Sequence, residues 1–167
     1  MAAPRHRVAI LPVLALATAC ASAGDRLNEG IALQSQGRYM EAVYRYAEAV
    51  ERDAELVEAR DRLLAAGDTA ITLAMDEADD LERRGNPVGS AERYRDIDQM
   101  LARVRQVGMR LDTPGDYDTI RRAVFDNAVG WRMLRGSEAS GLGRWEDARG
   151  HFVGARADFL IPSRMQV

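Results

Sequence analysis

The sequence of 167 residues contains no lysine, one cysteine and only two histidines. Without lysine, the chain can form neither a Walker-type phosphate loop nor a Schiff base with a substrate. One cysteine allows no intramolecular disulfide, and one cysteine with two histidines supplies too few nitrogen and sulfur ligands for a zinc site. We therefore expect neither a metal nor a cofactor.

A surplus of basic residues is also missing, because 23 basic residues face 26 acidic ones and the net charge is −3. Nucleic-acid-binding domains usually carry a basic surplus, so we expect no nucleic-acid partner. No Gly-x-Ser-x-Gly motif accompanies His151, and no pattern places two carboxylates together in an apolar cleft. The sequence therefore favours a protein that is not an enzyme, and an enzyme acting on cell-wall material is the less favoured alternative.

The first nineteen residues have the layout of a secretory signal. Arg5 and Arg7 give a positive start, an apolar stretch of about ten residues runs from Val8 to Ala17, and small residues follow. The apolar stretch is too short to cross a bilayer, which needs about 20 residues. We predict that residues 1–19 are a signal peptide that is removed on export.

The end of this segment, LATAC at residues 16–20, resembles the lipobox of bacterial lipoproteins. The resemblance implies that Cys20 is acylated and becomes the new N-terminus. The lipobox favours leucine three residues before the cysteine, where this chain has Ala17. The alternative is ordinary cleavage after Ala19 or Ala23 without a lipid.

Acylation of Cys20, with palmitate among the acyl chains, would anchor the protein stably, because each buried methylene contributes about 0.8 kcal/mol. Residues 20–24 would then be the lipidated N-terminus and a short tether. Ala21 stands where an aspartate would signal retention in the inner membrane. We therefore expect an exported lipoprotein in the outer membrane that faces the periplasm.

Beyond Ala23 the pattern is helical, because apolar residues recur at spacings of three and four and no β-branched run alternates with period two. We predict Asp25 as the N-cap of the first helix and Asn86, followed by Pro87, as the N-cap of the fourth. Gly67 is a candidate break in the third helix. The six expected helices cover residues 25–36, 39–53, 55–84, 87–109, 117–140 and 144–159.

Two segments match each other: GRYMEAVYRYAEAV at residues 37–50 and GRWEDARGHFVGA at residues 143–155. Both resemble tetratricopeptide repeats of about 34 residues. The resemblance implies repeats at 23–56 and 129–162, with two further hairpins between them. The expected fold is all-α, with antiparallel helical hairpins stacked as a short solenoid over residues 25–160 and a tail at 161–167. A plain irregular helix bundle is the alternative.

The resemblance also implies roles for particular residues. Small residues such as Gly30, Ala42 and Ala49 let the two helices of a hairpin approach closely, and the aromatic ring of Tyr46 fills the gap to the next repeat. The repeat-packing set is Gly30, Gly37, Tyr39, Ala42, Tyr46, Ala49, Gly136, Gly143, Trp145, Ala148, Phe152 and Ala155.

Tetratricopeptide arrays bind partner segments on a concave face formed by the first helix of each pair. The matching positions here are Leu27, Asn28, Ile31, Gln34 and Ser35 in the first repeat, and Met133, Ser137 and Ser140 in the last. Leu134 also occupies a matching position in the last repeat, and for Leu27, Ile31 and Leu134 the favoured role is packing against the next helix.

Two charged groups have competing interpretations. The acidic run from Asp76 to Glu82 is either a cation site or a solvated helix face balanced by neighbouring arginines. The arginines of the fourth helix, Arg95 and Arg103 among them, either meet anionic lipid or an acidic partner, or pair with acids of their own helix.

Together these patterns predict a membrane-anchored adaptor or scaffold that binds one or more proteins of the bacterial cell envelope. The alternative is a small structural subunit of a larger envelope or secretion assembly.

Overall fold

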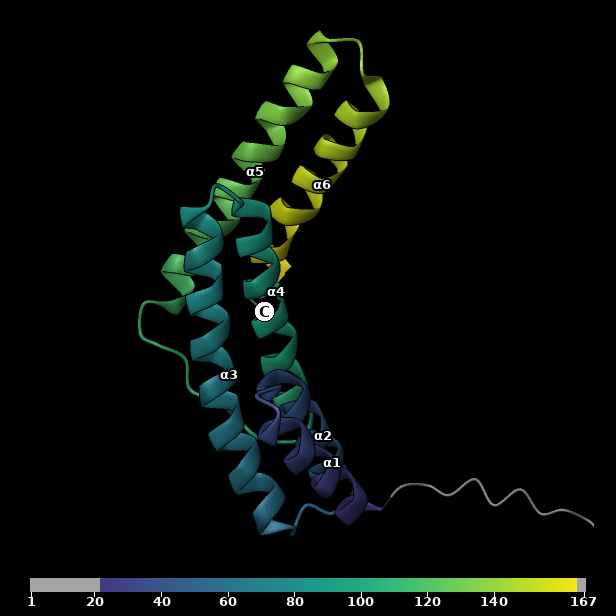
Figure 1. Ribbon diagram of the computed structural model, residues 1–167, viewed down its shortest axis with the longest axis vertical. Coiled ribbons are helices and arrows are strands. Elements are labelled where there is room, and N and C mark those ends of the chain that lie inside the picture. The colour runs from purple at the N-terminus through teal and green to yellow at the C-terminus, as the bar shows by residue number, and fades with distance from the viewer. Residues whose placement is uncertain (1–21, 165–167) are drawn as a thin grey trace, which may run out of the picture.

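The computed structural model describes residues 22–164, so the predicted signal peptide and Cys20 lie outside the described residues. The described residues form six helices and no strand (Figure 1), and none of these helices is long and apolar enough to cross a membrane. The prediction of an all-α fold is confirmed. The helices are α1 (Ala23–Ser35), α2 (Tyr39–Arg52), α3 (Val57–Arg83), α4 (Pro87–Gln106), α5 (Tyr117–Gly141) and α6 (Trp145–Arg164).

Four helices end at a glycine in the left-handed conformation, with φ of 75° at Gly37, 73° at Gly85, 74° at Gly108 and 71° at Gly143. The amide after each glycine donates to a carbonyl five residues earlier, which satisfies a helix-end acceptor. Of these four turns, the sequence pattern does not indicate the one at Gly108, which ends α4 before the expected residue 109.

Of the two predicted N-caps, the one of α4 is confirmed and the one of α1 is wrong. Asn86 caps α4 as expected, because its side chain accepts a hydrogen bond from the Gly89 amide at 3.0 Å, and Pro87 follows it. The N-cap of α1, however, is Ser22 and not Asp25. Asp25 lies in the first turn, and its carboxylate accepts a hydrogen bond from the Ser22 amide at 2.8 Å in a capping box. That backbone bond lowers the pKa of Asp25.

Gly67 does not break α3, which runs without interruption over 27 residues. A Cβ atom at Gly67 would lie 2.5 Å from the Leu111 side chain, so glycine here makes room for the loop between α4 and α5. At the other end of the chain, α6 continues to Arg164. The segment expected as a tail from residue 161 is therefore helical over its first four residues.

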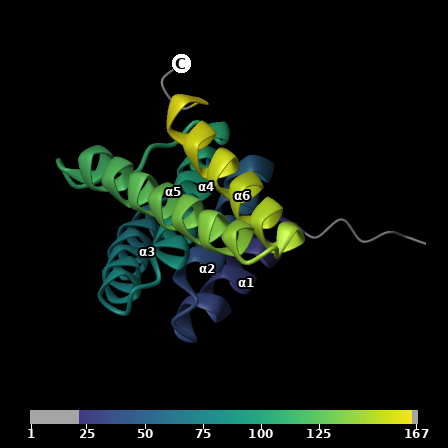
Figure 2. The same cartoon turned by 90° about the horizontal axis from the view of Figure 1, so that it is seen from above.

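Each helix packs mainly against its neighbours in the chain, and α2 also contacts α4. The molecule is elongated, with α1 and α2 at one end and the turn between α5 and α6 at the other (Figure 1). Figure 2 shows α6 lying along α5 on the side away from α3. Residues 57–128 hold one hairpin, α3 and α4, and the first half of α5, so the expectation of two hairpins there is wrong.

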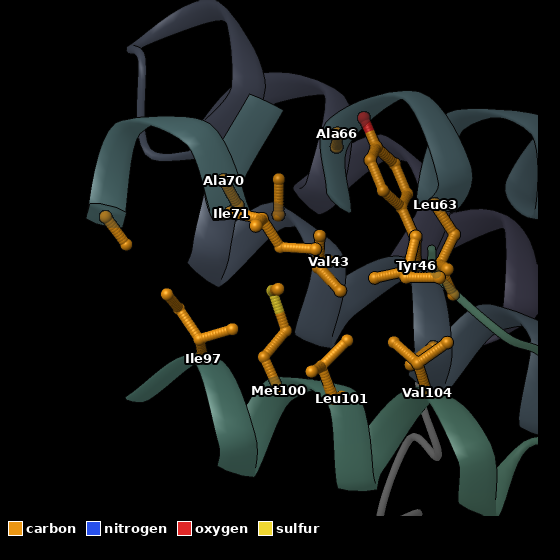
Figure 3. Packing of buried hydrophobic residues seen from close by; sticks show 14 of the residues in the cluster. Val43, Tyr46, Leu63, Ala66, Ala70, Ile71, Ile97, Met100, Leu101 and Val104 are labelled. Atoms are coloured by element: carbon orange, nitrogen blue, oxygen red, sulfur yellow. The ribbon is translucent and has the colours of Figure 1, made fainter. Parts of the chain in front are cut away.

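The apolar core runs from α1 and α2 through α3 and α4 to the first half of α5, and Figure 3 shows its part between α2, α3 and α4. Val43 and Tyr46 of α2 face Leu63 of α3 and Met100 of α4. Burying a large apolar side chain fully contributes about 1.5–3 kcal/mol, so this group dominates the stability of the fold. Towards the α5–α6 turn only small residues are buried, namely Gly136, Ala139, Ala148 and Ala155.

Candidate interaction surface

The two hairpins that match in sequence also match in their interiors. A Cβ atom at Gly30 would lie 2.4 Å from the Tyr46 ring, and one at Gly136 would lie 2.6 Å from the Phe152 ring. In both hairpins a glycine of the first helix therefore accepts an aromatic ring of the second helix. The alanines at the matching positions, Ala42, Ala49, Ala148 and Ala155, are all buried.

The outward face of α2 is covered by α3 and α4. Val43, Tyr46, Ala47 and Val50 are buried in the core, and Tyr39 is half-buried beside α3. Tyr46 has no exposed surface, and its hydroxyl donates a hydrogen bond to Gln34 Oε1 at 2.6 Å. This aromatic ring therefore joins its own hairpin to the next helix.

The matching face of α6 is uncovered. It consists of Trp145, Arg149, Phe152, Val153 and Arg156, which we call the α6 outer face. These residues lie on one side of the helix because their spacings are four, seven, eight and eleven. Trp145 is 68% exposed, Phe152 37% and Val153 61%, and both arginines are exposed. The expectation that Trp145 and Phe152 belong to the repeat packing is therefore wrong for Trp145 and only partly met by Phe152.

Three further large apolar side chains are exposed near the same turn: Met133, Leu134 and Leu142. Leu134 is 60% exposed, so its predicted packing against a following helix does not occur. The α5–α6 hairpin thus carries most of the exposed large apolar side chains of the described residues.

The expected concave face is not assembled. In α1, Leu27 is buried and Ile31 packs against the core, while Gln34 accepts the Tyr46 hydroxyl and Ser35 donates to its own helix at Ala32 O. Only Asn28 and Ser35 are exposed in that group.

The residues expected to complete the concave face lie elsewhere. Met133 and Ser137 are exposed and Ser140 is half-buried, all in the part of α5 near its turn. That part lies at the opposite end of the molecule from α1 (Figure 1). The structure therefore does not bring the two predicted groups into one groove.

The α5–α6 hairpin is attached to α4 through a buried carboxylate. Asp158 of α6 is 2% exposed and accepts hydrogen bonds from Arg95 of α4 at 2.6 Å and from Arg132 of α5 at 2.7 Å. Its charge is therefore compensated by two guanidinium groups. Asp158 therefore links α4, α5 and α6 through its two arginine partners.

A second buried carboxylate, Asp98 of α4, accepts hydrogen bonds from Arg121 Nε at 2.7 Å and from the Tyr117 hydroxyl at 3.1 Å, both in α5. Burial and the neighbouring Asp98 raise the pKa of Tyr117, so its hydroxyl keeps the proton that it donates. The Phe125 ring lies beneath the guanidinium groups of Arg95 at 5.9 Å and Arg121 at 5.7 Å.

The structure shows which partners the α4 arginines have. Arg93 pairs with Asp96 in its own helix at 3.3 Å and with Glu77 of α3 at 3.8 Å. Arg95, however, pairs with Asp158, and Arg103 pairs with Glu51 of α2 at 2.5 Å. All three arginines thus form ion pairs with other helices, which the sequence pattern does not indicate.

The remaining polar features show no organised site. In the acidic run, Asp80 pairs with Arg83 and Arg84, and among the described residues no group of three or more potential ligands is placed to hold a metal. An open hollow of about 410 Å³ between α5 and α6 is lined mainly by charged side chains. His151 at its edge packs against the Trp131 ring at 5.7 Å.

The chain matches no protein-family model, no curated protein and no solved structure. The case for its function therefore rests on the sequence motifs and on the geometry of the α5–α6 hairpin.

Proposed function

We propose that this chain is an exported lipoprotein, anchored through Cys20, that acts as a non-enzymatic adaptor or scaffold for proteins of the bacterial cell envelope. The observation that carries the adaptor proposal is the exposure of Trp145, Val153 and the other large apolar side chains on one hairpin. Soluble monomers rarely expose apolar side chains in groups, and such groups usually mark a binding surface.

The matched hairpins support a repeat architecture related to tetratricopeptide repeats. Both hairpins place a glycine against an aromatic ring, and both turn at a left-handed glycine, Gly37 or Gly143. Repeat arrays bury their hydrophobic faces between neighbouring hairpins, and a terminal hairpin keeps one such face free. In this interpretation the free face belongs to α6.

The positions of α1 and of the α5–α6 turn at opposite ends of the molecule support an anchored adaptor. Helix α1 begins at Ala23, three residues after Cys20 in the sequence. The α5–α6 turn lies at the far end of the long axis (Figure 1). A lipid on Cys20 would hold α1 near the outer membrane, and the exposed hairpin would then reach into the periplasm.

The lipid is tested by labelling. Cells that express the wild-type chain are grown with labelled palmitate beside cells that express Cys20→Ser. The wild type should incorporate the label and Cys20→Ser should not. Equal labelling of the two chains, or no labelling of either, would contradict the lipoprotein proposal.

The adaptor role is tested by pull-down of the full chain from membranes. A stoichiometric envelope protein is the expected result, and the absence of any stoichiometric partner contradicts the proposal. A small structural subunit of a larger assembly, the second candidate, would be recovered with several proteins in fixed ratio.

A further inference from the structure

The α6 outer face is the counterpart of a face that the same protein covers elsewhere. On α2, the residues Tyr39, Val43, Tyr46, Ala47 and Val50 lie against α3 and α4. On α6, the matching residues are exposed. We propose that the α6 outer face docks an acidic amphipathic helix of a partner protein, in the place that α3 occupies on α2. This inference rests on the proposed adaptor function and specifies the partner's chemistry.

The shape of the face fits one helix. Trp145, Phe152 and Val153 follow one another along about two turns of α6, and the face from Trp145 to Arg156 is about 16 Å long at 1.5 Å per residue. An amphipathic helix of about three turns covers that length with side chains spaced by three and four residues. On α2, Leu63 and Ala66 of α3 supply such side chains against Tyr46.

The charge of the face specifies the partner. Arg149 and Arg156 stand where α2 has Val43 and Val50. Neither arginine has an ion pair within the part of the chain that the structure describes. A helix identical to α3 would leave both guanidinium groups without partners at the interface. Carboxylates beside an apolar stripe would pair with them, and such electrostatic complementarity selects the partner.

An end cap, a symmetric dimer contact and a membrane contact each fit this face less well. A solubilising end cap would be polar throughout, yet Trp145, Phe152 and Val153 are apolar. A symmetric dimer through this face would bring arginines of two copies together, because a two-fold contact pairs a surface with itself. A membrane surface would meet the end of the molecule near α1, and the α5–α6 turn lies at the other end (Figure 1).

The experiment uses the full chain and two synthetic helical peptides of about 20 residues. Both peptides carry the same leucine and alanine stripe, and they differ only in flanking glutamates or flanking arginines. Binding is measured by tryptophan fluorescence at low and at physiological salt, in a chain that carries Trp131→Phe so that the signal comes from the exposed Trp145. The glutamate peptide should bind about tenfold more tightly than the arginine peptide, since two surface ion pairs together give roughly that factor. Added salt should reduce the difference.

Charge-reversal variants test the location. R149E/R156E should reverse the peptide preference. The control R60E/R122E changes the net charge equally through exposed arginines of α3 and α5, and it should keep the wild-type preference. Binding of neither peptide, equal binding of both, or the same loss in both variants would overturn the proposal. So would dimerisation that R149E/R156E abolishes, or tighter binding to phosphatidylglycerol vesicles than to the glutamate peptide.

Failure here is distinguishable from failure of the adaptor proposal. If the pull-down recovers a stoichiometric partner whose binding R149E/R156E leaves unchanged, the adaptor proposal stands and the docking site is elsewhere. If no partner is recovered, the adaptor proposal itself fails.

Discussion

The α1–α2 and α5–α6 hairpins share a glycine-aromatic contact, a left-handed glycine turn and buried alanines, yet they end in different surroundings. Tyr46 is fully buried beneath α3, whereas Phe152 stays partly exposed because no helix of residues 22–164 covers the α6 outer face. The comparison shows that the repeat pattern specifies a hairpin, while the neighbouring helices specify whether its outer face is core or surface.

The two ends of the molecule also differ in how they are held. The α2–α3–α4 end is held by apolar packing of residues such as Val43, Leu63 and Met100. Helices α5 and α6 are attached to α4 by buried apolar side chains of α5 such as Phe125 and, in addition, by two buried carboxylates, Asp98 and Asp158, which accept hydrogen bonds from arginines of neighbouring helices. Removing one partner of a buried ion pair is strongly destabilising, because it leaves an uncompensated charge in the interior.

The largest expected difference is between the losses in unfolding free energy of Tyr46→Ala and Phe152→Ala. Tyr46→Ala should lower the free energy of unfolding by about 3–5 kcal/mol, because it opens a cavity in the core. Phe152→Ala should lower it by about 1 kcal/mol, because much of that ring already contacts water. Denaturant unfolding of the full chain followed by circular dichroism measures both. Equal losses would contradict the conclusion that Tyr46 is covered by a neighbouring helix and Phe152 is not.

Asp158→Asn tests the ionic attachment. Removing the charge leaves Arg95 and Arg132 without their carboxylate, and since both arginines keep some exposure we expect a loss of about 2 kcal/mol. The control is Asp147→Asn, whose exposed carboxylate lies 3.9 Å from Arg144 and should matter by less than about 0.5 kcal/mol. Thermal unfolding of the two variants measures the difference, and similar melting temperatures would refute it.

The paired glycines give a smaller effect. Gly30→Ala forces a methyl group against the buried Tyr46 ring, and we expect a net loss of about 1–2 kcal/mol from overpacking. Gly136→Ala meets Phe152, which can move towards solvent, so the gain of about 1 kcal/mol in helix propensity offsets the crowding. Chemical unfolding compares the two, and a loss as large at Gly136 would show that the α5–α6 hairpin is as tightly packed.

The smallest expected effect at neutral pH is at the junction of α4 and α5. Tyr94 is fully buried, its ring lies 5.6 Å from that of Tyr117, and its hydroxyl has no hydrogen-bond partner among the described residues. Tyr94→Phe should therefore leave the stability at pH 7 nearly unchanged.

Burial raises the pKa of Tyr94 to about 12, above an unfolded value near 10. Between these values the folded state binds the proton more tightly, so stability falls as the pH rises. At pH 11 the wild type should lose about 1 kcal/mol more than Tyr94→Phe. Unfolding curves of the two chains at pH 7 and 11 measure this difference, and parallel losses would exclude a role for Tyr94.

Most of the helices can be predicted from the sequence, because helix ends depend on nearby residues. Asn86 with Pro87 and the glycines at 37 and 143 are identified in this way. The prediction of a helix break at Gly67 is wrong because the reason for this glycine is Leu111, which lies 44 positions further along the chain. A local pattern carries no information about such a contact.

The candidate surface is only partly predictable. The sequence places a concave face on α1 and α5, but Leu27 and Gln34 are used within the fold. The signal that the sequence does contain is the replacement of Val43 and Val50 by Arg149 and Arg156 at matching positions of the two repeats. The two arginines therefore identify the α6 outer face as the one that differs from its buried counterpart on α2.

The sequence by itself determined most of the helices and the turns at Gly37, Gly85 and Gly143, because these depend on residues close together along the chain. The tertiary structure alone decided that Tyr46 is covered and Phe152 is not, and that Arg95 pairs with Asp158 across 63 positions. Such contacts depend on which helices meet in space. Burial, and with it the strength of an ion pair or of an apolar contact, is set only when those helices have packed.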